Sequence, residues 1–207
     1  MTSVPDATEQ RRLLRYNNVS VAIHWISALL IVSQVAGGFL FENMERGPAR
    51  AEIFTWHKTI GVTILLLSLV RLGWRLANPP PPYPDAMPRW ERIAGTWNHR
   101  IFYALLLALP LTGLAAVSGG AGTAFTPLVG GIPFPLIPGL SEEAGDAIGG
   151  LHGTLVFTTL ALLAIHIAAA LKHQFVDRAR YAGRMPPFRS PDGEVAVAPA
   201  GQPGAAS

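Results

Sequence analysis

Residues 148–171, IGGLHGTLVFTTLALLAIHIAAAL, decide the fold, because their only ionisable side chains are His152 and His166. These 24 residues exceed the roughly 20 apolar residues that a helix needs to cross a bilayer. The segment therefore predicts a transmembrane helix with a histidine near each end.

Three more blocks of this kind precede it, at residues 19–41, 53–74 and 101–117. Half of the chain is apolar and only 14% is charged, against roughly a quarter in soluble domains. We predict an all-α integral membrane protein, a four-helix bundle with helices at about 19–41, 53–76, 95–117 and 148–172. This domain, 16–182, lies between an N-terminal tail, 1–15, and a C-terminal tail, 183–207, whose Pro, Ala and Gly content predicts disorder. The first block is too long for the apolar core of a signal peptide.

The basic residues predict how the bundle is oriented. The N-terminal tail, the link between the second and third helices, and the C-terminal tail hold thirteen Lys and Arg, against three on the opposite side. Because Lys and Arg are retained on the cytoplasmic side, both termini are expected in the cytoplasm. The excess of positive charge is then a topology signal, and no basic face for nucleic acid is expected.

The composition also excludes several kinds of site. The chain has no Cys, which rules out disulfides, thiolate metal sites and thioether-linked haem. No glycine-rich turn in a βαβ unit is visible for a nicotinamide or flavin cofactor. Any metal site must therefore rely on histidine.

Four of the six histidines fall inside apolar spans, where ionisable groups are usually functional. His152 and His166 are 14 residues apart, so they share one helix face about 21 Å apart along the axis. Counted from the helix ends, His24 lies at the depth of His166, and His57 at the depth of His152. We call His24 and His166 the inner pair, and His57 and His152 the outer pair.

Two histidines at one depth on facing helices are what axial ligation of a haem iron requires. Two such levels predict two haems, whereas zinc would need about four ligands at one place. Gly38 lies 14 residues after His24, and Gly113 stands in the same relation to His99, so each favours the close passage of a flat ligand. Ordinary packing of small residues between membrane helices is the alternative explanation.

Three further residues near the inner pair are candidates for cofactor binding. His99 lies close to the inner level, where a contact with a haem propionate or a lipid headgroup is favoured over axial ligation. Arg71 and Arg75 are four residues apart on one face, at the expected place of the inner propionates. Retention of positively charged side chains at the cytoplasmic membrane surface explains the two arginines equally well. His173, beside Lys172, is interpreted as a solvated residue at a helix end.

With these residues in view, the chain resembles the bacterial di-haem cytochrome b-561 family of four-helix inner-membrane proteins, over about residues 15–182. The resemblance rests on these motifs: His24-Trp25; His57-Lys58 with Gly61; Val70-Arg71-Leu72; Asn98-His99-Arg100 with Tyr103 and Pro110-Leu-Thr-Gly113; and Leu151-His152 with His166. It implies two b-type haems, one on each pair, and electron transfer between a periplasmic donor or acceptor and membrane quinone. One branch is similar to superoxide oxidase, which passes an electron from superoxide to ubiquinone.

We therefore predict a membrane oxidoreductase that carries electrons between a periplasmic donor or acceptor and the quinone pool, with ubiquinone as its electron partner. A caution concerns superoxide, because the predicted outer side has three cations against six carboxylates and so a net negative charge. The alternative is a cytochrome b subunit that docks a periplasmic redox protein, as in hydrogenase-like complexes, through the long outer loop predicted at 118–147. A haem-free transporter or structural bundle is the third interpretation.

Overall fold

The computed structural model describes residues 14–83, 87–178, 183–188 and 196–197. Four long helices make up most of it: α1 (Asn18–Glu42), α2 (Pro48–Ala77), α3 (Arg89–Ser118) and α4 (Glu142–Leu171). The shorter elements are β1 (Leu14–Arg15), β2 (Phe125–Pro127), η2 (Val129–Gly131), β3 (Pro133–Pro135), the π-helical turn η3 (Lys172–Val176) and β4 (Ala196–Val197). The predicted four-helix bundle is confirmed.

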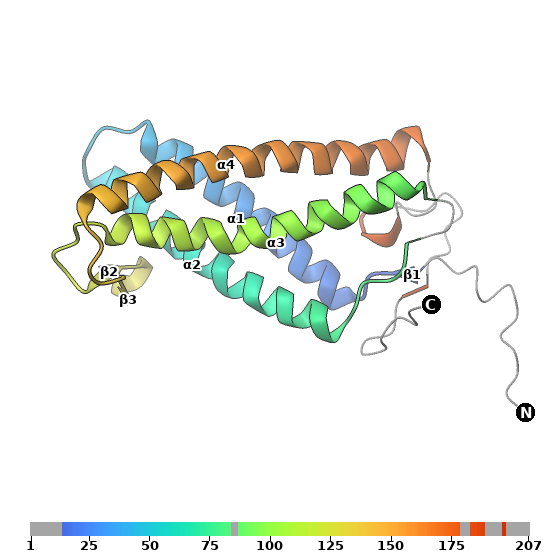
Figure 1. Ribbon diagram of the computed structural model, residues 1–207, viewed down its shortest axis with the longest axis horizontal. Helices are drawn as coiled ribbons and strands as arrows, with labels where there is room; N and C mark the ends of the chain where they lie inside the picture. The colour runs from blue at the N-terminus through green and yellow to red at the C-terminus, as the bar shows by residue number, and fades with distance from the viewer. Residues whose placement is uncertain (1–13, 84–86, 179–182, 189–195, 198–207) are drawn as a thin grey trace, which may run out of the picture.

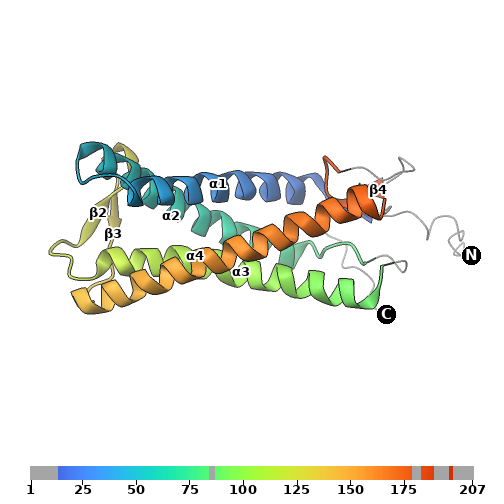
Figure 2. The ribbon, with the colours of Figure 1, turned by 90° about the horizontal axis from the view of Figure 1, so that it is seen from above.

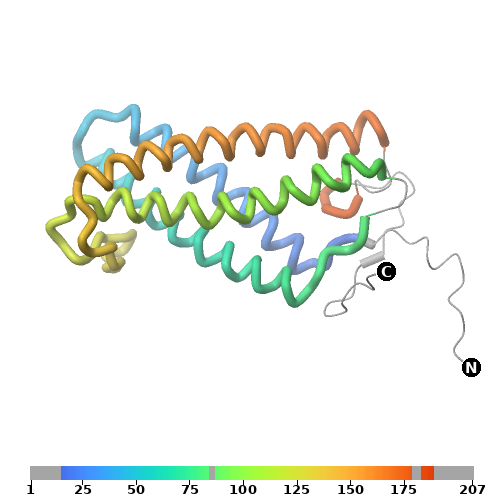
Figure 3. The backbone as a smooth tube through the Cα atoms, viewed as in Figure 1, coloured from blue at the N-terminus to red at the C-terminus, as the bar shows by residue number. Residues whose placement is uncertain are grey.

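The helices run up and down along one long axis, with α1 beside α2 and α3 beside α4 (Figures 1 and 2). The α2 and α3 helices also pack together. One end of the bundle holds the β2–β3 hairpin and the other holds the start of α1 (Figure 3). We call these the hairpin end and the Asn18 end.

All four helices are long and apolar enough to cross a membrane. Large apolar side chains point away from the bundle along each of them; Leu29 and Phe157, for example, are 68% and 64% exposed. In water such helices would leave much apolar surface unburied, whereas lipid tails cover it without cost. The exposed surface therefore fits a bilayer around the bundle.

Local signals explain why the helices begin earlier than their apolar runs. Pro48 occupies the first turn of α2, where the missing N–H of proline costs nothing. The side chain of Ser141 caps α4 by accepting a hydrogen bond from the backbone N–H of Ala144, and Glu142 and Glu143 occupy its first turn. The end of the segment that we expected to be a loop, 118–147, thus belongs to α4.

The end of α3 and the start of α4 approach closely at two glycines near the hairpin end. A Cβ on Gly145 would lie 2.6 Å from the Cα of Gly119, which is inside any normal contact distance. Only glycine permits this approach, and it fixes the start of α4 against the end of α3.

Two two-stranded sheets complete the fold. β2 and β3 form an antiparallel hairpin, with Thr126 opposite Phe134, and β1 pairs with β4 in parallel. Residues 183–188, part of the tail that we expected to be disordered, pack at the Asn18 end. There Trp25 donates a hydrogen bond from its indole N–H to the carbonyl of Pro186 at 2.6 Å.

Candidate functional site

The structure brings the four membrane histidines together in the two pairs that depth counting predicts. The ring centres of His24 and His166 are 6.4 Å apart, and those of His57 and His152 are 6.5 Å apart. A metal–imidazole bond is about 2 Å long and the ring centre lies roughly 1 Å beyond the nitrogen, so two rings on opposite sides of one metal stand roughly 6 Å apart. Both pairs therefore have the spacing of two axial ligands.

The contacts of His152 favour the proton arrangement that ligation requires. Its Nδ1 lies 3.0 Å from the backbone carbonyl of Leu109, an acceptor, and 3.2 Å from the hydroxyl of Thr112. A proton on Nδ1 leaves Nε2 as the free lone pair, which is how a second residue orients a metal-binding histidine.

His57 is different, because its Nδ1 is buried and meets no partner at hydrogen-bonding geometry among the described residues, although the backbone of Gln34 lies near. The side-chain oxygen of Gln34 is likewise buried, and no described residue gives it a hydrogen bond. Buried polar atoms without hydrogen-bond partners are uncommon in native proteins. Two buried polar atoms beside the outer pair are therefore left unpaired by the described residues.

A large cavity surrounds the outer pair. Its volume is about 670 Å³, within the range of roughly 300–1,000 Å³ typical of ligand pockets. All four helices and the hairpin line it, and its walls are mostly apolar. A flat, apolar group between His57 and His152 fits this space.

Two glycines lie directly against the rings of the outer pair. A Cβ on Gly38 would stand 3.3 Å from Cε1 of His57, and one on Gly113 would stand 3.2 Å from Cε1 of His152. Any larger residue would push a ring out of place. The sequence signal for these glycines was their 14-residue offset from His24 and His99, and the structure places them at the outer pair.

The β2–β3 hairpin closes the cavity at its end, with Thr126, Leu128 and Phe134 among the lining residues. It is fastened to α2, because the ammonium of Lys58 donates to the hydroxyl of Thr126 at 2.7 Å. The N–H of Val129 donates to Thr59 in the same way, at 3.0 Å. Sequence reasoning missed this lid, since the segment has no helical or strand periodicity long enough to detect.

The inner pair is surrounded by basic and aromatic residues. A pocket of about 50 Å³ touches His24, Arg71, Arg75, His99 and Tyr103. Both guanidinium groups lie over the ring of Tyr103, at 5.7 and 5.5 Å from its centre. Positive charge thus gathers at the Asn18 end, where an anionic group would be stabilised.

Arg71 also contacts His24, with its Nη2 3.2 Å from the ring Nδ1. Arginine only donates, so this contact needs a lone pair on Nδ1, whereas ligation through Nε2 needs a proton there. A metal on the inner pair therefore requires either the ring to turn or Arg71 to find another acceptor. The fit to a metal is direct at the outer pair and depends on this change at the inner pair.

His99 lies beside the inner pair, with its ring centre 5.7 Å from that of His166. Its Nδ1 is 2.7 Å from the carbonyl of Gly95, so a proton on Nδ1 leaves its Nε2 unprotonated.

The C-terminal segment adds a cluster of aromatic residues around an arginine at the Asn18 end. Arg184 is only 8% exposed, lies over the rings of Tyr16 and Tyr83, and donates a hydrogen bond to the carbonyl of Pro81. Burial raises the pKa of Tyr16 above its ordinary value of 10.0, against the opposing effect of the nearby guanidinium groups. The tail thereby fastens the start of α1 to the link after α2.

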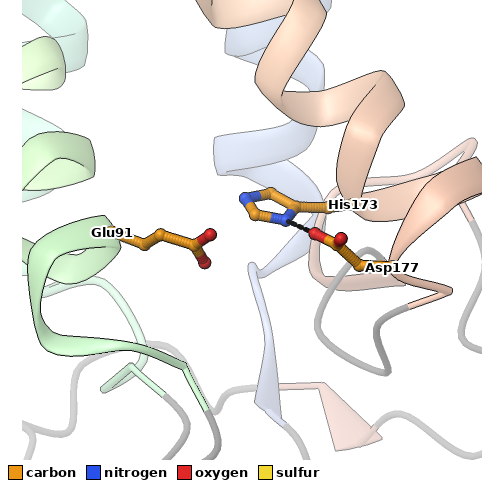
Figure 4. Close-up of side chains that lie close together, drawn as sticks. All are labelled: Glu91, His173 and Asp177. Carbon is orange, nitrogen blue, oxygen red and sulfur yellow. Dashed lines mark hydrogen bonds and ion pairs between the residues drawn. The ribbon is translucent and has the colours of Figure 1, made fainter.

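A second group of polar residues links α3 to the turn after α4. Figure 4 shows Glu91 facing His173 and Asp177, with a hydrogen bond of 3.0 Å between the last two. The ammonium of Lys172 lies 2.6 Å from Asp177 and 3.3 Å from Glu91, so one positive charge bridges the two carboxylates. We interpret this group as an ionic link between helices.

Comparison with known proteins identifies the family. The model of prokaryotic cytochrome b561 matches residues 15–187, most of the chain. The chain belongs to the prokaryotic cytochrome b561 family. As a cytochrome b561 it binds b-type haem, transfers electrons and spans the bacterial inner membrane several times.

Curated relatives of this cytochrome b561 agree with the assignment. "Cytochrome b561 homolog 2" of Escherichia coli K12 is 28% identical over 172 residues, covering 79% of this chain and 87% of that protein. "Probable superoxide oxidase CybB" of Yersinia pestis is 28% identical over 181 residues, 84% of this chain and 96% of that protein. "Cytochrome b562" of Cereibacter sphaeroides is 27% identical over 180 residues, covering 82% of this chain and 94% of that protein.

Proposed function

We propose that this cytochrome b561 holds two b-type haems, one on the inner pair and one on the outer pair, and carries electrons between membrane quinone and a redox partner on the periplasmic side. The observation that carries the proposal is the equal spacing of the two pairs, 6.4 and 6.5 Å between ring centres. Haem supplies reversible one-electron chemistry, and two histidines on one iron leave no open position for oxygen.

The residues around each pair make different contributions to haem binding. Gly38 and Gly113 leave room beside the outer rings, and Leu109 orients His152. Arg71 and Arg75 supply positive charge for the inner propionates. A propionate would also be the other acceptor that Arg71 needs in order to release His24.

We further propose that the Asn18 end faces the cytoplasm and the hairpin end faces the periplasm. Thirteen of the sixteen Lys and Arg belong to the two tails and to the link between α2 and α3. The described parts of these segments lie at the Asn18 end (Figure 1), and the positive-inside rule assigns them to the cytoplasm. The outer pair then lies near the periplasmic surface and the inner pair near the cytoplasmic surface.

The experiment is to purify the full chain in detergent and measure haem per protein and the reduced-minus-oxidised spectrum. We expect two haems in the wild type, with His152→Ala impairing one of them and His166→Ala the other. His173→Ala is the matched control, because that histidine lies in the ionic link and should leave both haems in place. A preparation that stays colourless when haem is supplied would contradict the proposal.

The donor is tested by adding superoxide or quinol to the oxidised protein. The superoxide activity in the name of the Yersinia pestis relative belongs to that protein. Here two of the three cations on the hairpin side are already engaged, Lys58 with Thr126 and Arg50 with the carbonyl of Phe41. We therefore expect faster haem reduction by quinol than by superoxide, and the reverse order would assign superoxide as the donor.

One observation favours a second function, that of a subunit docking a periplasmic redox protein. The hairpin region exposes apolar side chains, with Phe125 at 56% and Ile132 at 60%. Co-purification of one stoichiometric second chain, lost in Phe125→Ser, would support docking over a free-standing carrier.

A further inference from the structure

The amide of Asn98 stands opposite the outward nitrogen of an inner-pair histidine. Asn98 lies on α3, and its Nδ2 is 3.0 Å from Nδ1 of His166 on α4. Its other polar atom, Oδ1, is buried and has no hydrogen-bond partner among the residues that the structure describes. The contact therefore uses the amide nitrogen of Asn98 and leaves its carbonyl oxygen, the only hydrogen-bond acceptor of the side chain, without a donor.

This arrangement suits a histidine without metal but not one that ligates. When Nε2 of His166 binds iron, the ring proton must sit on Nδ1. An Nδ1–H facing an Nδ2–H sets two donors against each other. An amide has nearly the same shape after a half-turn, so rotation brings Oδ1 to face Nδ1 without moving either helix.

We propose that Asn98 is the positioning residue of the inner haem: its carbonyl oxygen accepts the Nδ1 proton of His166, fixing the ring and the tautomer that ligates. This rests on the proposed function, since it takes His166 as an iron ligand. The rotated amide gives the partnerless Oδ1 a donor and removes the clash of donors.

The role sets the two haem sites apart chemically. The outer pair orients His152 with a backbone carbonyl, that of Leu109, which no side-chain substitution removes. The inner pair uses a side chain, which substitution can change. An acceptor on Nδ1 makes the imidazole more electron-donating and favours ferric iron, so Asn98 lowers the potential of the inner haem.

The test is a redox titration of the purified, haem-loaded full chain, following both haems optically and the ferric low-spin signals by electron paramagnetic resonance. Asn98→Leu keeps the size and removes the acceptor. We expect the reduced-to-oxidised ratio of one haem to rise about tenfold at fixed potential, which is 59 mV for one electron. The outer haem should be unchanged.

Asn98→Asp is the conservative variant, with the same shape and only acceptor oxygens. It should move the same haem in the opposite direction from Asn98→Leu, because a carboxylate accepts the Nδ1 proton more strongly than an amide does. Ser33→Ala is the matched control, because that hydroxyl bonds to the carbonyl of Leu29 in its own helix. It should leave both potentials as they are.

Two results would overturn the proposal. The first refutes only the role of Asn98, and the second also refutes His166 as a haem ligand. With two haems present, unchanged potentials in Asn98→Leu, or a shift of Asn98→Asp in the same direction, refute the positioning role alone. A His166→Ala variant that keeps both haems refutes the ligand assignment, and the role of Asn98 falls with it.

Discussion

A methyl group added at Gly113 gives the sharpest test of the outer site. The new Cβ would lie 3.2 Å from Cε1 and 3.4 Å from Nδ1 of His152. Favourable carbon contacts lie at about 3.5–4.0 Å, so the ring must retreat by roughly 0.3–0.8 Å. It cannot retreat freely, because its Nδ1 is hydrogen-bonded to the carbonyl of Leu109 at 3.0 Å.

Disturbing the contacts that orient a metal ligand typically costs about 10- to 100-fold in metal affinity. Alanine is also a better helix former than glycine by about 1 kcal/mol, so the helix itself should not weaken. We therefore expect Gly113→Ala to lose the outer haem while the apoprotein melts no earlier than wild type. This combination separates a ligand effect from general destabilisation.

The assay is haem per protein, measured after purification and again during transfer of haem to excess apomyoglobin. Gly150→Ala is the matched control, since nothing lies within 4 Å of its added Cβ and it is exposed on the facing helix. If Gly113→Ala releases haem at the wild-type rate and keeps the wild-type spectrum, the geometric account of the outer site is refuted.

Three other predictions concern the fold. Gly145→Ala should lower the melting temperature, since overpacking against the α3 backbone costs about 1–3 kcal/mol; a melting temperature equal to wild type would contradict the close approach. Lys58→Met should speed amide exchange across residues 125–135 about tenfold, because a charged hydrogen bond of about 1.5 kcal/mol is lost. Exchange is measured by mass spectrometry, and an unchanged rate would show that the bond from Lys58 to Thr126 does not hold the hairpin. Since the pKa of Tyr16 is raised in the folded state, stability should fall as pH rises above about 10, where the unfolded phenol ionises first. Melting temperatures at pH 9 and 11 check this, and Tyr16→Phe should flatten the slope.

The bundle and the pairing of helices by depth could be predicted from sequence because both follow from length and rise along a helix. Counting residues from the ends of apolar runs places His24 level with His166 without any knowledge of packing. The family assignment from the motifs is confirmed. The site residues remain predictions, for which the ring spacings now supply the geometry.

What sequence could not supply is how the helices are rotated about their axes. Asn98 is visible in the sequence as a neighbour of His99, but only the packing of α3 on α4 shows that it faces His166. The carbonyl of Leu109 carries no sequence signal at all, since every residue has one. The hairpin escaped detection because each strand has only three residues, too few for a pattern.

The sharing of α4 by both histidine pairs has a consequence for how the protein is made. The inner pair takes His166 and the outer pair takes His152 from this one helix, the last of the four to leave the ribosome. A nascent chain that ends before α4 has half of each pair and can complete neither. In the proposed two-haem arrangement, haem capture at both levels waits for the final membrane insertion, and a chain truncated there would carry no bis-histidine centre into the membrane.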